Sequence, residues 1–311
     1  MQVRDVLPRD AIPSVDSPRF GTDYFGEDGD DVVAVEHDDR ARAYPLRILS
    51  YHEVVNVAEE DLAVTWCPIC GSAVVYEATV DGRALTFGVS GKLADDGLVL
   101  YDRETESEWH QPTGECLDGP FAGERLRALP ASVLPYGRFR EAYPDGEVLQ
   151  PERGRGEPGG PAAAYDMDPY EAYFDREAFG LHGMRGMGEP RSWDREDLGP
   201  KAVVLGLELG GEAVAYPRER VAEAGGLVTD TVGGRRITVV LADGELHAFA
   251  TPEVDLSLAD GSLRGDGTTW DPATGESADG RRLDRLPGRR LFAFAWQDAH
   301  GRGTFYTSQT D

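Results

Sequence analysis

The chain carries three short sequence signatures twice, in the same order. The matching segments are residues 43–45 with 215–217 (Ala-Tyr-Pro), 109–115 with 270–276 (Trp at the start, Thr-Gly-Glu at the end), and 129–130 with 286–287 (Leu-Pro). An apolar run precedes each Ala-Tyr-Pro. Three matches in one order are typical of a tandem duplication, so we predict one fold unit that is present twice.

The residue types that bind metals or act as nucleophiles occur at the matched positions of the first copy only. Counted from the shared Tyr-Pro, His52 is replaced by Ala224 in the second copy, and the segment from Cys67 to Cys70 lies opposite a shorter turn at residues 242–245. Directly after the shared Thr-Gly-Glu, Cys116 is replaced by Ser277. Residues that are present or absent together are typical of a single site. We therefore predict that the functional site lies in the first half.

The pattern of short apolar runs and turns predicts an α+β fold that is dominated by strands and built from two tandem, pseudo-equivalent lobes. The expected organisation is an N-terminal arm (1–30), a first lobe with the Cys-x-x-Cys segment (31–150), a connector rich in Pro, Gly and charge (151–199), and a second lobe without the site residues (200–309).

Local signals place the regular elements within these lobes. In the first lobe we expect strands at residues 31–35, 62–66, 73–79, 84–89 and 98–101, with a hairpin at Asp81-Gly82. Proline at the first turn and an apolar stripe predict helices over residues 45–55 and 217–224, the second ended by a Gly pair. The connector has one short helical segment at residues 168–174.

The charge of the chain restricts its partners. Among 311 residues the formal net charge is −26, and only Lys92 and Lys201 are lysines. A dispersed acidic, lysine-poor surface is typical of a protein that stays soluble in concentrated salt, so we expect a halophilic protein. An ordinary acidic protein is the alternative. Nucleic acids and anionic membranes are excluded as partners, because neither finds a basic surface.

No stretch of the sequence reaches the roughly 20 apolar residues of a membrane span, and the N-terminus lacks the apolar region of a signal peptide. We therefore expect a cytoplasmic protein. In that compartment three cysteines favour metal or redox chemistry over a disulfide framework.

Cys67 and Cys70 are the strongest candidates for chemistry. They leave a predicted strand and are separated by two residues, so that both sulfurs can face one point. This spacing suits a metal ion or a reversible disulfide. The alternative is that both thiols are buried as small apolar side chains.

Three further residues are candidate members of this site. His52 lies near the end of the first predicted helix and is either a metal ligand, the base that keeps a cysteine as thiolate, or a capping histidine. Lys92 lies in a Gly-rich segment, where its ammonium either lowers the pKa of a thiol or pairs with a carboxylate such as Asp102 or Glu104. Cys116 is either a fourth ligand or a small apolar filler.

Several motifs together resemble one protein family. They are the run at residues 7–13 (LPRDAIP), Ala43 to Leu46 (AYPL), His52 to Asn56 (HEVVN), Trp66 to Ser72 (WCPICGS), Phe87 to Leu93 (FGVSGKL) and Tyr101 to Ser107 (YDRETES). The chain resembles the family called domain of unknown function 3179 (DUF3179), as a haloarchaeal-type member. The resemblance implies no established activity. Some relatives are regarded as possible selenoproteins, which implies a redox-capable position in the Cys-x-x-Cys segment, and members usually carry a small residue at the position of Cys116.

Two functions follow from these candidates. The first is a thiol redox or metal centre built on Cys67 and Cys70, tuned or ligated by His52 and assisted by Lys92. The second is a binding or scaffold protein in which zinc holds a loop. The sequence leaves open whether the metal is zinc, copper or iron, and whether the partner is a small molecule or a protein.

Overall fold

The computed structural model describes residues 1–38, 40–152, 165–251 and 254–307. Strands dominate its regular structure and the helices are short, which confirms the α+β prediction. Among the described residues, no helix is both long and apolar enough to cross a membrane. The predicted connector and second lobe extend into residues 153–164, 252–253 and 308–309, which lie outside the described part.

The first half opens with a hairpin of β3 (Asp31–His37) and β4 (Arg40–Pro45), which leads directly into α1 (Leu46–His52). The helix ends three residues earlier than the sequence predicts. Glu53 adopts the left-handed conformation, with φ of 60°, and the β-branched residues that follow form β5 (Val54–Val57). The hairpin belongs to a five-stranded sheet with the order β15-β3-β4-β16-β2, whose other strands are β15 (Ser132–Pro135), β16 (Glu147–Leu149) and β2 (Phe20–Gly21).

A second sheet joins the two halves of the chain. Its order is β18-β17-β26-β7-β6-β5, and a further strand, β14 (Ala128–Leu129), pairs with β7. The remaining strands are β6 (Leu62–Cys67) and β7 (Ser72–Glu77) from the first half, and β17 (Val203–Leu209), β18 (Glu212–Pro217) and β26 (Arg289–Phe292) from the second. The junction is the pairing of Arg290 with Ala73. One sheet therefore continues through both predicted lobes.

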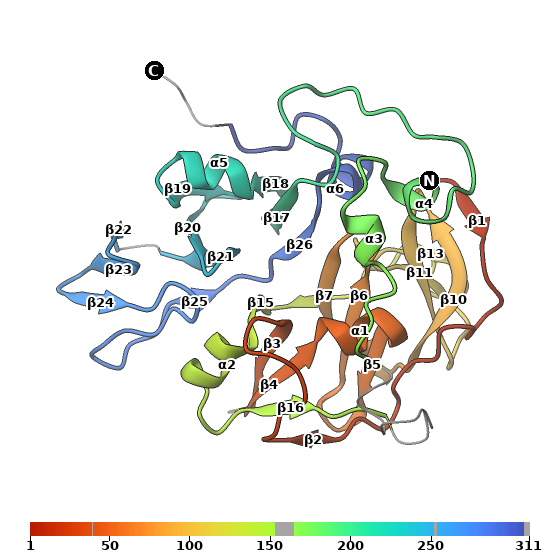
Figure 1. Cartoon of the computed structure of the whole chain (residues 1–311), viewed down its shortest axis with the longest axis horizontal. Coiled ribbons are helices and arrows are strands. Elements are labelled where there is room, and N and C mark those ends of the chain that lie inside the picture. Colours follow the sequence, from red (N-terminus) through yellow and green to blue (C-terminus); the bar gives the residue numbers. More distant parts are fainter. Residues whose placement is uncertain (39, 153–164, 252–253, 308–311) are drawn as a thin grey trace.

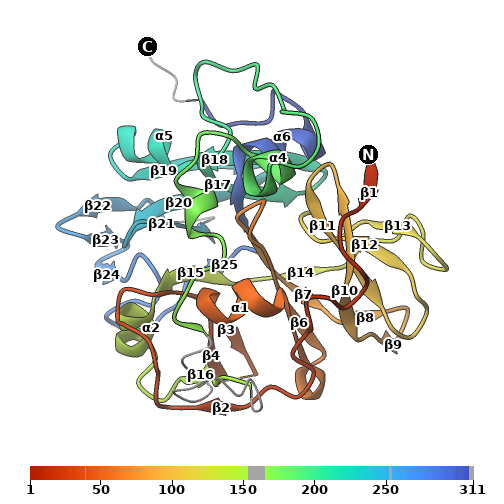
Figure 2. The ribbon, with the colours of Figure 1, turned by 45° about the vertical axis from the view of Figure 1, so that its right-hand side comes forward.

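The rest of the first half forms a third sheet beside the first two (Figures 1 and 2). Its order is β1-β10-β11-β12-β13, with bounds Val3–Asp5, Phe87–Ala94, Gly97–Asp102, Glu108–His110 and Cys116–Asp118. The predicted Asp81-Gly82 hairpin is confirmed by β8 (Thr79–Val80) and β9 (Arg83–Ala84). The single strand expected at residues 84–89 is wrong, because the chain leaves β9 and pairs anew as β10.

The second half repeats the order of the first on a smaller scale. The hairpin β17-β18 leads into α5 (Arg218–Glu223), as β3-β4 leads into α1. A sheet of β19 (Leu227–Val232), β20 (Arg235–Ala242), β21 (Glu245–Ala250) and β25 (Asp284–Arg285) follows, then β22 (Ser257–Ala259), β23 (Ser262–Gly265) and β24 (Thr268–Trp270). β26 returns to pair with β17, as β15 returns to pair with β3. Each return strand runs into a helix, α2 (Tyr136–Ala142) or α6 (Ala293–His300).

The connector carries α3 (Glu171–Phe174) and α4 (Gly180–Arg185), which lie over the first half, next to the start of the chain (Figure 1). Lys201 holds the end of α3, because its Nζ donates hydrogen bonds to the carbonyl oxygens of Tyr173, Phe174 and Arg176. The largest cluster of buried apolar residues draws on β6, β10, β26 and α6, so the main core also spans both halves.

Candidate functional site

The two candidate cysteines lie at the hairpin turn between β6 and β7. Cys67 is the last residue of β6 and pairs with Ser72 at the start of β7, and Cys70 lies in the turn between them. Gly71 closes the turn with φ of +57°, a conformation that costs glycine little. Both thiols are buried, with 1% of Cys67 and none of Cys70 exposed, and neither forms a disulfide in this structure.

The backbone of this turn is held by residues from outside the hairpin. Three successive carbonyl oxygens accept hydrogen bonds: Ile69 from Tyr173 Oη (2.8 Å), Cys70 from Phe292 N (2.7 Å) and Gly71 from Arg290 Nη1 (2.8 Å). The donors belong to the connector and to β26. The second half of the chain therefore fixes the conformation of the turn that carries the thiols.

A small cavity of about 40 Å³ lies against Cys67. That volume holds about one or two water molecules. Apolar residues of the N-terminal arm, β10 and α4 form most of its wall, and its ionisable members are Glu53, Lys92, Tyr170 and Arg185. Hereafter this space is the thiol cavity. The structure thus brings Cys67 and Lys92 to one cavity, together with a carboxyl group that sequence reasoning did not select.

Glu53 is that carboxyl group, and its environment is unusual for an acid. It is 5% exposed, and Tyr170 Oη donates a hydrogen bond to its Oε1 at 3.2 Å. Burial raises the pKa of Glu53 to about 7, against the opposing effects of the Tyr170 hydrogen bond and the Arg185 charge. An acid with a pKa near neutrality can both accept and release a proton under physiological conditions.

The backbone of Glu53 has a left-handed conformation like that of the matching glycine in the second copy. Counted from the shared Tyr-Pro, Glu53 falls opposite Gly225, which adopts φ of +86°. The first copy places an ionisable residue in the same left-handed region, where non-glycine residues are strained. Strain of this kind concentrates at functional sites. Ten other Asp and Glu residues in the described part of the chain also adopt positive φ, so the backbone conformation alone does not single out Glu53.

His52 points away from the thiols. Its Nδ1 donates to the carbonyl oxygen of Pro13 at 2.7 Å, and its Nε2 lies 2.7 Å from the hydroxyl of Tyr165. A neutral imidazole that donates through Nδ1 accepts through Nε2, so both nitrogens are used. The expected convergence of His52 with Cys67 and Cys70 is not found, because the described residues contain no group of three or more His, Cys, Asp or Glu side chains that could hold a metal ion. A metal role for the thiols stays a prediction.

Comparison with known proteins identifies the family of this chain. The family model described as "Protein of unknown function (DUF3179)" matches residues 9–303. The chain belongs to the DUF3179 family. No curated protein and no solved structure matches it.

Lys92 is held by a carboxylate in the DUF3179 fold. Its Nζ donates to Glu108 Oε1 at 2.6 Å, so the partner is neither Asp102 nor Glu104. Asp102 instead accepts from Trp109 Nε1, and Glu104 accepts from Thr86 N. The ion pair favours a bracing role for Lys92 at the wall of the thiol cavity.

The Lys92→Met variant separates bracing from activation of a thiol. Because the change leaves the mostly buried Glu108 carboxylate without its cation, we expect a loss of about 1–3 kcal/mol in the free energy of unfolding. The pH profile of thiol alkylation should stay unchanged, and Lys92→Arg should recover part of the stability. Denaturant titration and alkylation rates measure the two effects. A thiol profile shifted to higher pH would assign Lys92 to the chemistry instead.

Cys116 lies apart from the other two thiols. It begins β13, and its Sγ donates a weak hydrogen bond to the carbonyl oxygen of Asp118 at 3.3 Å. Burial raises the pKa of Cys116 to about 11. A protonated thiol is a poor ligand and a poor nucleophile, so this environment favours the role of an apolar filler.

Proposed function

We propose that Cys67 and Cys70 form a thiol–disulfide redox pair and that Glu53 exchanges the proton of Cys67. The observation that carries this proposal is that Cys67 and Glu53 line one small cavity, and that burial holds the pKa of Glu53 near 7. Sulfur reacts as thiolate, so a neighbouring proton acceptor of this strength supports attack by Cys67.

The two thiols have unequal environments, which supports unequal roles. Cys67 faces the thiol cavity, whereas burial, with a further effect of the neighbouring Cys67 thiol, raises the pKa of Cys70 well above its ordinary value. Cys70 Sγ also donates to the carbonyl oxygen of Asp96 at 3.4 Å. We assign the attacking sulfur to Cys67 and the second, resolving sulfur to Cys70.

The size of the thiol cavity restricts the oxidant. A space of about 40 Å³ admits a water-sized molecule such as hydrogen peroxide and excludes larger disulfides unless α4 or the N-terminal arm moves. Leu181 and Met184 of α4 and Ile12 of the arm form part of the wall. We therefore take a peroxide as the oxidant class.

The reaction balances without a further oxidant. Cys67 gives its proton to Glu53, and its thiolate attacks one peroxide oxygen. The O–O bond breaks to give a sulfenic acid and hydroxide, which takes the proton from Glu53 and leaves as water. Cys70 sulfur then attacks Cys67 sulfur. The S–O bond breaks, and the leaving hydroxide takes the Cys70 proton to form a second water. Two thiols and one peroxide thus give one disulfide and two waters.

The test is oxidation of the full chain by hydrogen peroxide, followed by mass spectrometry. We expect loss of two hydrogen atoms and a Cys67–Cys70 disulfide in the wild type. In Cys70→Ser we expect a sulfenic acid that dimedone traps at Cys67, and Cys67→Ser should be inert. Cys116→Ser is the matched control and should behave as the wild type.

Elemental analysis of the same sample distinguishes the alternative function. Stoichiometric zinc together with thiols that resist peroxide would contradict the redox proposal and favour the scaffold protein with a structural metal. Equal reactivity of Cys67→Ser and wild type would also contradict it, because the attacking sulfur would then lie elsewhere.

We also infer that the scaffold arose by internal duplication. This inference is supported by the shared order of elements, in which β3, β4, α1, β15 and α2 correspond to β17, β18, α5, β26 and α6. The halophilic, haloarchaeal-type character and the cytoplasmic location are proposals that rest on the net charge of −26 and the scarcity of lysine.

A further inference from the structure

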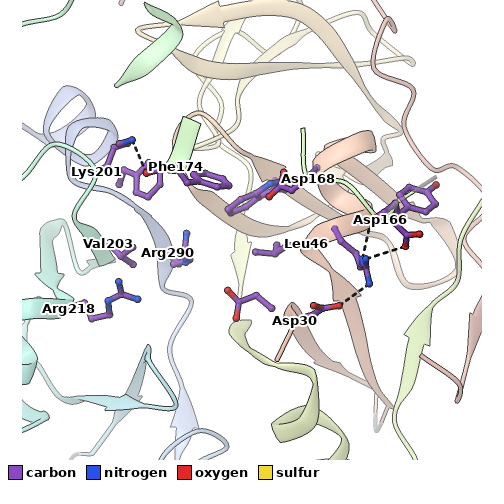
Figure 3. A pocket seen from close by; sticks show the side chains of 15 residues that line it. Asp30, Leu46, Asp166, Asp168, Phe174, Lys201, Val203, Arg218 and Arg290 are labelled. Carbon is purple, nitrogen blue, oxygen red and sulfur yellow. Dashed lines mark hydrogen bonds and ion pairs between the residues drawn. The ribbon is translucent and has the colours of Figure 1, made fainter. Parts of the chain in front are cut away.

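A second, much larger cavity lies where the two halves meet. Its volume is about 540 Å³, within the range of small-molecule sites. Residues of the first half, the connector and the second half line it together, and Figure 3 shows Arg218 and Arg290 on one side with Asp30 and Asp166 on the other. Hereafter this space is the interlobe cleft. Its location and lining separate it from the thiol cavity.

One buried polar atom that lines the cleft, Trp66 Nε1, has no hydrogen-bond partner in the part of the chain that the structure describes. The Asp31 carboxylate forms neither a hydrogen bond nor an ion pair, although Asp31 is only partly exposed. Buried polar groups are nearly always satisfied, so unsatisfied ones that line a cavity point to a ligand.

The two arginines at the second-half wall share one carboxylate. Glu245 lies 3.6 Å from Arg218 Nη1 and 3.4 Å from Arg290 Nε. Arg290 also donates to the carbonyl oxygen of Gly71, and Arg218 to that of Gly244. Burial and the Glu245 charge raise the pKa of Asp31, and the charges of Arg290 and Arg218 oppose this, so the Asp31 carboxylate lies close to both arginines.

The other charged residues of the cleft are already paired. Arg47 contacts Asp30 at 3.1 Å and Asp166 at 3.6 Å, and Lys201 is held by three carbonyl oxygens. Asp168 accepts a hydrogen bond from the backbone N–H of Tyr170. What the cleft offers a ligand is therefore a cation pair on the second-half wall and the Asp31 carboxylate at the start of β3.

We propose that the interlobe cleft binds a zwitterionic small molecule of the α-amino acid type. The ligand carboxylate pairs with Arg218 and Arg290, and its ammonium group pairs with Asp31. The apolar part of the ligand packs against the aromatic rings of Phe174 and Phe292, which line the same cleft. Arginine forks suit carboxylates, and an aromatic wall favours an apolar or aromatic ligand side chain.

The test compares three probes that differ in one charge each, by calorimetry on the full chain. The probes are L-phenylalanine, 3-phenylpropanoate (no ammonium) and 2-phenylethylamine (no carboxylate). We expect L-phenylalanine to bind at least about tenfold more tightly than either analogue, because only L-phenylalanine has both a carboxylate for the two arginines and an ammonium group for Asp31. Absence of binding by all three, or binding of 3-phenylpropanoate as tight as that of L-phenylalanine, overturns the proposal.

Two variants test which charged residues of the cleft contact the ammonium group and the carboxylate of the ligand. Asp31→Asn should abolish the preference for L-phenylalanine over 3-phenylpropanoate, and Arg218→Gln should weaken both about tenfold or more. Arg264→Gln, an exposed arginine elsewhere in the second half, is the control and should change neither. If neither Asp31→Asn nor Arg218→Gln alters binding, the ligand does not occupy this cleft.

The same titration with the Cys67→Ser/Cys70→Ser double variant separates this proposal from the redox proposal. We expect unchanged affinity for L-phenylalanine, because neither thiol lines the interlobe cleft. Binding that survives in a chain without redox activity supports the cleft independently. Loss of binding in the correctly folded double variant would contradict the assignment.

Discussion

Replacing Glu53 with glutamine is expected to remove a large pH-dependent term from the stability of the fold. Burial raises the pKa of Glu53 from 4.5 to about 7 on folding. The folded state thus holds the proton more tightly, and this contribution is full below pH 4.5 and is lost as the pH rises through 7. Between those limits, the stability of Glu53→Gln relative to wild type should rise by about 3 kcal/mol.

Denaturant titrations at a series of pH values, at constant high salt, measure this difference. Glu223→Gln removes the same charge from an exposed site at the end of α5 and serves as the control. It should follow the wild-type pH dependence. Parallel curves for wild type and Glu53→Gln would show that the carboxyl group ionises in the folded state as it does in the unfolded chain.

The same variant also tests the chemical role of Glu53. If its carboxylate accepts the Cys67 proton, oxidation of Cys67 by peroxide should slow by about 100-fold or more in Glu53→Gln, the usual size of a general-base contribution. The rate of the wild type should increase with pH through about 7, as the carboxyl group ionises, and this dependence should disappear in the variant. A purely structural role would change stability and leave the pH–rate profile intact.

Replacing Arg290 with methionine is expected to cost about 3–5 kcal/mol in the free energy of unfolding. The side chain is 16% exposed, pairs with the buried Glu245 carboxylate and donates a hydrogen bond to the carbonyl oxygen of Gly71. Gly71 belongs to the turn between β6 and β7 that carries Cys70, hereafter the thiol turn. Its removal leaves a buried charge with only the more distant Arg218 and leaves a turn carbonyl without its donor. Alkylation of Cys70 should accelerate as well, because the turn loses one of its three outside contacts.

The double variant Arg290→Met/Glu245→Gln gives this prediction a second measurement. It should recover part of the lost stability, because the uncompensated charge is gone, yet Cys70 should stay accessible. Arg264→Met is the matched control, since its ion pair with Asp260 is exposed, and it should change stability by less than about 1 kcal/mol. A cost below that value for Arg290→Met would mean that the Arg290 side chain does not hold the thiol turn.

Local patterns in the sequence correctly indicated several elements of the fold. Residues 62–66 and 73–79 were expected to be strands on either side of the Cys-x-x-Cys segment, and they correspond to β6 and β7. The Asp81-Gly82 hairpin and the helix after Pro217 also form as predicted. These features depend on side-chain alternation, turn residues and proline, whose effects extend over a few neighbouring residues.

The site itself depends on contacts between distant segments. The replacement of His52 by Ala224 in the second copy favoured His52. In the structure α1 directs that imidazole toward Pro13 and Tyr165, and the next residue, Glu53, shares the thiol cavity with Cys67. Periodicity does not reveal which way a side chain leaves the end of a helix.

The two copies of the sequence predicted two equivalent lobes and a site in the first of them. Only the tertiary structure decided that β26 pairs with β7, that Arg290 holds the thiol turn, and that a cleft forms between the halves. Residue types and short spacings determine which elements form, because those preferences act locally. Which charged groups become neighbours, and which pKa values shift, depends on burial between segments that lie far apart in the chain.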